Sequence, residues 1–293
     1  MKALTYIPPI IISVLLLSSC ASVGPSNSMQ TTFTERDDVA LRDTHERLNG
    51  VLWMQTSAEY QVLYKVAYKQ ARESVGEALR DPKWNAVVDQ IGESTKNLTP
   101  AIIVDIDETV LDNSKFQGQL VLNRSGYSSD LWDQWVKLHA ATSTPGSVDF
   151  LRWASSKNIS IFYITNREIK VERETIQNLI SENFPNVSQE TVLSKGEIDN
   201  SSDKKARRAF VARNHRIILL VGDDLGDFVS GAKDSPENRI ALANKYSSYW
   251  GTRWILLPNA LYGSWESALY GNDFSKSDNE QLIEKMSTVQ GFK

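Results

Sequence analysis

Residues 101–109 read Ala-Ile-Ile-Val-Asp-Ile-Asp-Glu-Thr, an apolar run that ends in two aspartates one residue apart. A continuous apolar run is typical of a strand buried in a parallel sheet. Asp105 and Asp107 then lie where this strand ends. In open α/β sheets ligands bind in the crevice beyond the carboxyl ends of the strands, so this position favours chemistry over core packing. The pair alone also fits a cap of a strand or turn.

Two neighbouring carboxylates can divide the work of phosphoryl transfer. One can attack the phosphorus and form an aspartyl-phosphate, while the other moves the proton. Because the two acids repel each other and an anionic substrate, they need a cation. Mg²⁺ is the natural one, since it binds one or two carboxylates together with phosphate oxygens.

Two later segments supply groups that can hold phosphate. The apolar run in residues 160–167 ends in Thr165 and Asn166, whose hydroxyl and amide can donate hydrogen bonds to phosphate oxygens. Residues 201–208, Ser-Ser-Asp-Lys-Lys-Ala-Arg-Arg, begin a basic helix that can place one lysine over the phosphorylated carboxylate. Each segment alone also fits a structural role, a helix N-cap and a solvated helix face.

A third apolar run, in residues 216–227, returns acidic groups to the same sheet edge. It ends in Gly222 and then in Asp223, Asp224 and Asp227, which can complete an oxygen shell for Mg²⁺. A turn is the alternative for Gly-Asp-Asp. Turns and caps do not explain the order of the four segments, whereas catalysis does.

This order resembles the haloacid dehalogenase superfamily of phosphohydrolases. The resemblance implies that Asp105 is the nucleophile, that Asp107 is the general acid and base, and that Thr165 and Asn166 bind phosphate. A Ser-x-Lys-x-x-Arg pattern favours Lys204 over the adjacent Lys205 as the phosphate-binding lysine. The implied magnesium ligands are Asp105, Asp107, Asp223, Asp224 and Asp227, with Asp223 the best of the late acids.

Further motifs narrow the resemblance. Trp132-Asp-Gln-Trp135, the stretches 144–150 and 162–167, and Leu-Pro-Asn-Ala-Leu-Tyr-Gly-Ser-Trp-Glu at 257–266 are similar to the lipoprotein e family of class C acid phosphatases and 5'-nucleotidases. This implies a Rossmann-like α/β core with a smaller α-helical domain, acting on phosphomonoesters that include nucleoside 5'-monophosphates.

By position in these motifs, Trp132 and Tyr262 match the aromatic residues that sandwich a nucleobase. Stacking of a base on an aromatic side chain contributes roughly 1–3 kcal/mol. Packing in the core is the alternative for both rings. Two other functions remain open at this point: a broad acid phosphatase or phosphotransferase without nucleotide preference, and a non-catalytic surface lipoprotein that binds a ligand.

The amino terminus predicts export. Lys2 precedes a short apolar stretch, Ile7 to Leu17, and Leu17-Ser-Ser-Cys20 resembles the bacterial lipobox. We expect residues 1–19 to be a lipoprotein signal peptide, Cys20 to carry the lipid, and residues 20–35 to form a tether. By resemblance to known sorting rules, Ser22 indicates the outer membrane of a Gram-negative cell.

The spacing of apolar residues divides the remaining chain into a helical region, a core and a tail. Three- and four-residue spacing of apolar residues predicts helices over 36–97. The phosphatase core is expected over 98–272, with a helical insert at about 112–143 and further strands at 239–243 and 253–258. Residues 273–293 read as a polar tail with a short helix.

Composition excludes several classes of function. The 293 residues are 41% hydrophobic and 23% charged, which fits a globular protein. The net charge of −4 argues against a nucleic-acid partner, because such proteins carry a basic surface. The three histidines do not form a zinc motif, and the chain contains no GxxxxGK[ST] phosphate loop.

Overall fold

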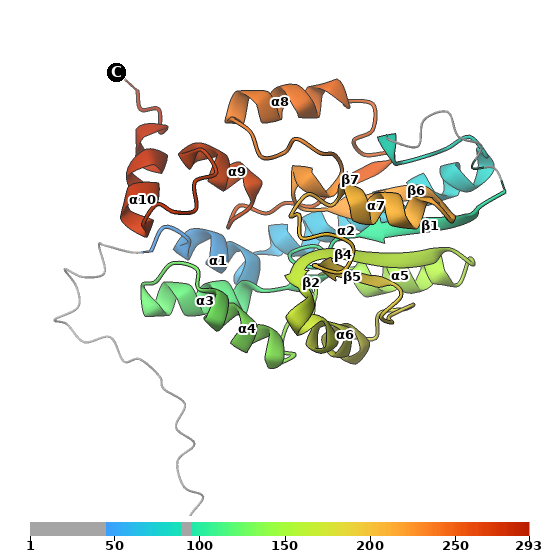
Figure 1. Cartoon of the computed structure of the whole chain (residues 1–293), viewed down its shortest axis with the longest axis horizontal. Helices are drawn as coiled ribbons and strands as arrows, with labels where there is room; N and C mark the ends of the chain where they lie inside the picture. The colour runs from blue at the N-terminus through green and yellow to red at the C-terminus, as the bar shows by residue number, and fades with distance from the viewer. Residues whose placement is uncertain (1–44, 89–94, 96, 293) are drawn as a thin grey trace, which may run out of the picture. The chain divides into compact units, whose positions relative to one another are not determined.

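The main sheet has five parallel strands in the order β5-β4-β1-β6-β7 (Figure 1). The computed structural model describes residues 45–88, 95 and 97–292. At the centre lies β1 (Thr99–Val104), the strand that precedes Asp105, between β4 (Ser160–Glu168) and β6 (His215–Gly222). The expected parallel α/β core is confirmed. Its edge strands are β5 (Val192–Lys195) and β7 (Trp254–Leu256).

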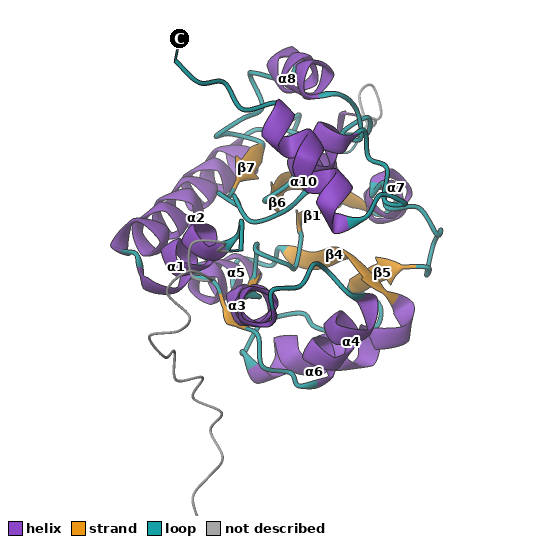
Figure 2. Cartoon of the chain, turned by 90° about the vertical axis from the view of Figure 1, so that its left-hand side faces the viewer, coloured by secondary structure: helices purple, strands orange, loops and turns teal. Residues whose placement is uncertain are grey.

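Alternate residues of the strands face two hydrophobic cores. Ile102 and Val104 of β1 belong to the core formed with α2 (Ala58–Arg80) and α5 (Ser147–Ser155). Ala101 and Ile103 belong to the core on the side of α7 (Lys205–Ala212). Figure 2 shows α2 and α5 on one side of the sheet and α7 on the other. Because β1 is covered on both faces, its run is apolar without alternation.

A row of tyrosines on α2 connects this helix to the loop after β1. Tyr60, Tyr64 and Tyr68 are buried at four-residue intervals, on one face of the helix. The Tyr64 hydroxyl donates to the Glu108 carbonyl oxygen at 2.5 Å, and the Tyr68 hydroxyl to the Thr109 carbonyl oxygen at 2.7 Å. The row therefore packs the sheet and also fixes the backbone that follows Asp107.

The segment expected as a helical insert contains two helices and a small hairpin. The antiparallel strands β2 (Leu111–Asp112) and β3 (Thr142–Ser143) flank α3 (Ser114–Asn123) and α4 (Ser129–Lys137). The insert begins directly beyond the loop that carries Asp107. This placement brings α4 close to the carboxyl ends of the central strands.

Aromatic rings gather around Trp254 on β7, which is fully buried. Its ring centroid lies 4.8 Å from that of Tyr249, 5.0 Å from Trp250 and 5.6 Å from Phe228. Phe228 follows η5 (Leu225–Asp227) directly in the chain. The cluster thus joins the edge of the sheet to Asp227, the last residue of η5.

In the main sheet, one expected strand is wrong and one strand was missed. Residues 239–243 lie within α8 (Pro236–Lys245), which begins with a Ser235 side-chain cap and a proline in its first turn. These start signals and the alanines favour a helix over a short strand. The missed strand, β5, has four residues at the sheet edge, where the sequence signal is short.

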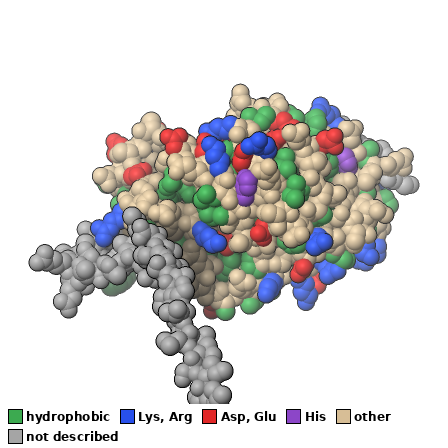
Figure 3. Space-filling view, turned by 90° about the horizontal axis from the view of Figure 1, so that it is seen from below, with side chains coloured by type: hydrophobic (Ala, Val, Ile, Leu, Met, Phe, Trp, Pro, Cys, Tyr) green, Lys and Arg blue, Asp and Glu red, His purple; other side chains and the backbone are tan. Residues whose placement is uncertain are grey.

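The remaining elements complete the molecule. On the face that Figure 3 shows, basic and acidic side chains are interspersed among apolar and other residues. The predicted signal peptide, Cys20 and the tether lie outside the described residues. The other helices are α1 (Leu48–Thr56), η4 (Ile169–Val171), α6 (Glu172–Ser181), α9 (Ser264–Ser267), η6 (Ala268–Tyr270) and α10 (Asp278–Ser287).

Candidate active site

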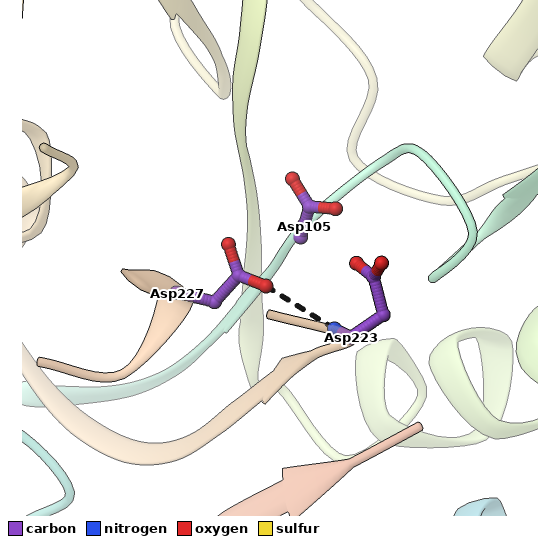
Figure 4. Close-up of side chains that lie close together, drawn as sticks. All are labelled: Asp105, Asp223 and Asp227. Atoms are coloured by element: carbon purple, nitrogen blue, oxygen red, sulfur yellow. Dashed lines mark hydrogen bonds between the residues drawn. The ribbon is translucent and has the colours of Figure 1, made fainter. Parts of the chain in front are cut away.

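Three carboxylates meet at the carboxyl ends of the central strands. Asp105 follows β1, Asp223 follows β6, and Asp227 ends η5 (Figure 4). Each offers an oxygen within 4.8 Å of the other two. A backbone hydrogen bond of 2.9 Å from Asp105 N to Val221 O holds the two strand ends in register. The fold therefore brings together acids that are more than 110 residues apart.

Lys204 supplies the positive charge that faces these acids. Its Nζ lies in close contact with Asp105 Oδ1 and 2.7 Å from Asp227 Oδ1. Burial alone would lower the pKa of Lys204, but the two carboxylates raise it to about 12. Lys205, by contrast, is exposed. Of the two candidate lysines, Lys204 is the one that lies at the predicted nucleophile.

One lysine does not balance the three clustered carboxylates, of which Asp105 and Asp227 are buried and Asp223 is half-buried. Burial raises the pKa of Asp105 to about 7 despite Lys204, and burial together with Asp105 raises that of Asp223 well above its usual value. Asp223 also accepts a hydrogen bond of 2.8 Å from Asn259 Nδ2. A hard divalent cation would supply the missing positive charge and favour the ionised acids.

Asp107 faces a different cation. Arg167, at the end of β4, donates from Nη2 to Asp107 Oδ1 at 2.7 Å and from Nε to the same oxygen at 3.0 Å. The Arg167 side chain is 1% exposed, and its Nη1 donates to Thr175 Oγ1 at 3.2 Å. This fixed guanidinium sets the direction of the Asp107 carboxylate. The sequence signal for Arg167 was ambiguous, because Thr-Asn-Arg also reads as a helix cap.

The two predicted phosphate-binding residues on β4, Thr165 and Asn166, have different hydrogen-bond partners. Thr165 is fully buried, and its Oγ1 accepts from Arg167 N at 3.0 Å. The Asn166 amide donates to Ser202 O at 3.1 Å and accepts from Arg207 Nη2 at 2.8 Å. Asn166 thereby ties the end of β4 to the loop that carries Lys204.

Asp224 does not join the metal-type group. Its Oδ1 accepts from Gly226 N at 2.8 Å and caps η5, while its Oδ2 accepts from Ser264 N at 2.6 Å. The carboxylate of Asp107, turned toward Arg167, is not one of the three clustered acids either. Two of the five acids expected around a metal therefore have other partners: Asp224 caps η5 and accepts from Ser264, and Asp107 pairs with Arg167.

The two predicted stacking residues border the Asp107 region. The Trp132 ring lies over the Arg167 guanidinium at 5.4 Å and packs edge-on against Phe116 at 4.9 Å. The Tyr262 hydroxyl is in close contact with Glu108 Oε2. Trp132 thus contacts Arg167, the hydrogen-bond partner of Asp107, and Tyr262 contacts Glu108, the next residue in the chain.

Glu108 was not singled out in the sequence, where it is one more acid beside two aspartates. It is fully buried, and its backbone φ of 54° lies in the left-handed region. Burial, with a contribution from Asp107, raises the pKa of Glu108 to about 8. A buried acid in this conformation is costly, and such costs concentrate at functional sites.

Comparison with known proteins agrees with this geometry. Residues 30–265 match the family model described as HAD superfamily, subfamily IIIB (acid phosphatase). The structure of the class C acid phosphatase from Bacillus anthracis is 34% identical, covers 84% of this chain and 98% of its own, and superposes with a TM-score of 0.76. The same enzyme with tungstate bound gives 33% identity, the same coverage and a TM-score of 0.75. The chain therefore belongs to the subfamily IIIB acid phosphatases of the HAD superfamily and is a phosphomonoesterase.

Proposed function

We propose that this protein hydrolyses nucleoside 5'-monophosphates with Mg²⁺ and an aspartyl-phosphate intermediate. The observation that carries the proposal is the arrangement around Asp105, which is clustered with Asp223 and Asp227 and faces Lys204. A second acid, Asp107, lies two residues away and is held by its own arginine. The two acids thus have different cationic partners, Lys204 for Asp105 and Arg167 for Asp107, and can take different roles, as nucleophile and proton donor.

The donor set fits Mg²⁺. Asp105, Asp223 and Asp227 would hold the ion, because Lys204 pairs with only Asp105 and Asp227 and one lysine leaves an excess of negative charge among the three acids. When bound, the ion neutralises the acids and the phosphate oxygens and lets the substrate approach the nucleophile. Thr109 Oγ1 lies 3.3 Å from Asp105 Oδ2 and 3.2 Å from Asp223 Oδ1, where it orients both acids.

In the first half of the reaction, a carboxylate oxygen of Asp105 attacks the phosphorus and the ester oxygen departs. Asp107 gives its proton to that oxygen, which leaves as the alcohol of the nucleoside. Lys204 Nζ stabilises the charge on the phosphoryl oxygens. In the second half, Asp107 takes a proton from water, the water oxygen attacks the aspartyl-phosphate, and inorganic phosphate is released with Asp105 restored.

The nucleotide preference is supported by the positions of two rings. Trp132 and Tyr262 border the region of Asp107, the proposed donor to the leaving group. Any planar base can stack on such rings, whatever hydrogen-bonding groups it carries. The related Bacillus anthracis enzyme binds tungstate, an oxyanion that resembles phosphate in charge and shape, and this supports the oxyanion chemistry proposed here.

We also propose that Cys20 is lipidated and anchors the enzyme to the outer membrane of a Gram-negative cell. The support is the apolar stretch followed by Leu17-Ser-Ser-Cys20. Among the helices that the structure describes, none has both the length and the hydropathy for a membrane crossing. Mass spectrometry of the mature amino terminus tests the proposal: an acylated Cys20 supports it, and an unmodified or retained leader contradicts it.

The direct test of the enzymatic proposal is phosphate release from adenosine 5'-monophosphate at mildly acidic pH. We expect release with Mg²⁺ and loss of release with EDTA that added Mg²⁺ restores. Glycerol 3-phosphate, which has no ring, should be a poorer substrate by kcat/KM. Equal rates on both compounds would contradict the nucleotide preference, and release that persists in EDTA would contradict the metal requirement.

A further inference from the structure

A buried hydrogen-bond network begins at Glu108, the residue after the proposed proton donor. Glu108 Oε1 accepts from Asn113 N at 3.0 Å, and Oε2 accepts from Asn113 Nδ2 at 3.3 Å. The Tyr262 hydroxyl also donates to Oε2, from a segment 154 residues further along the chain. One buried carboxylate therefore joins the loop after β1, the start of the insert and the segment after β7.

Asn113 extends the network in two directions. Its Nδ2 donates to Asp107 Oδ1 at 2.9 Å, so the same amide contacts both Glu108 and Asp107. Its Oδ1 accepts from Trp135 Nε1 at 2.8 Å. Asn113 is fully buried, so these contacts form without competition from water.

The contact with Trp135 ties α4 to this network. Trp135 and Trp132 are three residues apart on this helix and therefore share a face. Trp132 in turn lies over Arg167, the arginine that holds Asp107. The two aromatic residues of the proposed base site are thus both attached to the Glu108–Asn113 pair, Tyr262 directly and Trp132 through α4.

We propose that Glu108 and Asn113 are positioning residues that set the separation of Trp132 and Tyr262 and orient Asp107. Recognition of a planar leaving group and its protonation then depend on one buried unit. Burying an acid with three donors costs more than an apolar contact, but a fully bonded polar network specifies one geometry. The inference rests on the proposed nucleotide preference for its substrate class.

The first test separates leaving-group recognition from stability. Tyr262→Phe keeps the ring and removes its bond to Glu108, and Glu108→Gln keeps the shape and removes an acceptor oxygen. For each we expect KM for adenosine 5'-monophosphate to rise about tenfold, with less than about a twofold change for glycerol 3-phosphate, as for loss of one buried hydrogen bond. The double variant should be no worse than the poorer single variant, because both remove the same bond.

Tyr163→Phe is the matched control. Its hydroxyl donates to Pro185 O at 2.7 Å, away from this network, so its loss tests a buried tyrosine bond in general. We expect unchanged KM for both substrates. Equal KM increases for both substrates in Tyr262→Phe, or additive effects in the double variant, would overturn the proposal. Tyr262→Phe keeps this part of the test available if Glu108→Gln fails to fold.

The second test concerns Asp107. In Asn113→Ala we expect kcat to fall about tenfold for glycerol 3-phosphate and less for p-nitrophenyl phosphate, whose nitrophenolate leaves without a proton. Equal losses of kcat for both compounds would show that Asn113 does not act through the proton donor. This comparison needs no nucleotide, so it remains decisive if the enzyme shows no nucleotide preference. Failure of the positioning role of Asn113 can therefore be distinguished from failure of the proposed nucleotide preference.

Discussion

Each carboxylate in this site has its own neighbour, and the neighbour decides what the carboxylate can do. Asp105 faces Lys204, Asp107 faces Arg167, and Glu108 faces Tyr262 and Asn113. The same chemical group therefore serves as a proposed nucleophile, proton donor and anchor within four residues of chain. Predictions at this scale concern one side chain and its partner.

Asp105→Asn should abolish turnover and keep the fold. The amide retains the shape of the carboxylate but does not attack phosphorus, so we expect kcat to fall by at least about 10³-fold. Phosphate release and the thermal midpoint measure the two properties. Residual activity above this level in a folded variant would rule out Asp105 as the nucleophile.

Arg167→Lys should lower kcat although the charge is kept. A lysine cannot make the two-atom contact of the guanidinium, so Asp107 loses its fixed direction. We expect a loss of roughly 10- to 100-fold, the usual effect of misplacing a catalytic group. Arg173→Lys, in an exposed ion pair, is the control and should be neutral. Equal behaviour of the two variants would contradict this role.

The stability of the metal-free enzyme should depend on Glu108. Its folded pKa of about 8 lies above its ordinary value of 4.5, so the folded state holds this proton where the unfolded chain has lost it. The contribution of Glu108 to stability therefore falls as pH rises from about 4.5 to 8. Thermal unfolding in EDTA should show a smaller decline over this range in Glu108→Gln, and parallel declines would contradict it.

At the scale of elements, the buried central strands were predictable and the turns that follow them were not. The apolar runs before Asp105 and Asp223 carry a strong signal because β1 and β6 are buried on both faces. The bond from Tyr262 to Glu108 joins positions 154 residues apart. The spacing of residues in the sequence does not predict such a contact. It also does not predict in which directions the adjacent side chains of Asp223 and Asp224 point.

Helix α2 should stabilise the catalytic loop through its tyrosines. In Tyr64→Phe the Glu108 carbonyl oxygen loses a buried donor, and we expect the free energy of unfolding to fall by about 1–3 kcal/mol. Denaturant unfolding measures this change. Tyr127→Phe, at a tyrosine that is 60% exposed, should change stability far less. A neutral Tyr64→Phe would mean that α2 contributes packing alone.

At the scale of the whole molecule, charged side chains connect the beginning and the end of the described chain. Lys285 of α10 contacts Glu46 at 2.9 Å and also bonds Glu266, while Arg47 lies 3.5 Å from Glu266. The edge of the sheet that carries the three clustered carboxylates is likewise assembled from distant segments. A ligand that binds this edge in the folded state alone should therefore stabilise the whole fold.

Mg²⁺ should raise the thermal midpoint of the EDTA-treated enzyme. An ion that binds the folded state alone stabilises it by about 2.7 kcal/mol at a concentration of 100 times Kd. Differential scanning fluorimetry with increasing Mg²⁺ measures the shift. Asp223→Asn should reduce the shift, since it removes one of three clustered carboxylates. An equal shift in this variant would place the ion elsewhere.

The aromatic cluster around Trp254 has an optical consequence. Rings that approach within 4.8–5.6 Å in a chiral setting couple electronically and produce strong circular dichroism in the near ultraviolet. Phe228 belongs to this cluster and follows Asp227 directly in the chain. We expect a shift of Asp227 on cation binding to change this signal through Phe228, and the cluster would then serve as a spectroscopic reporter that needs no added dye.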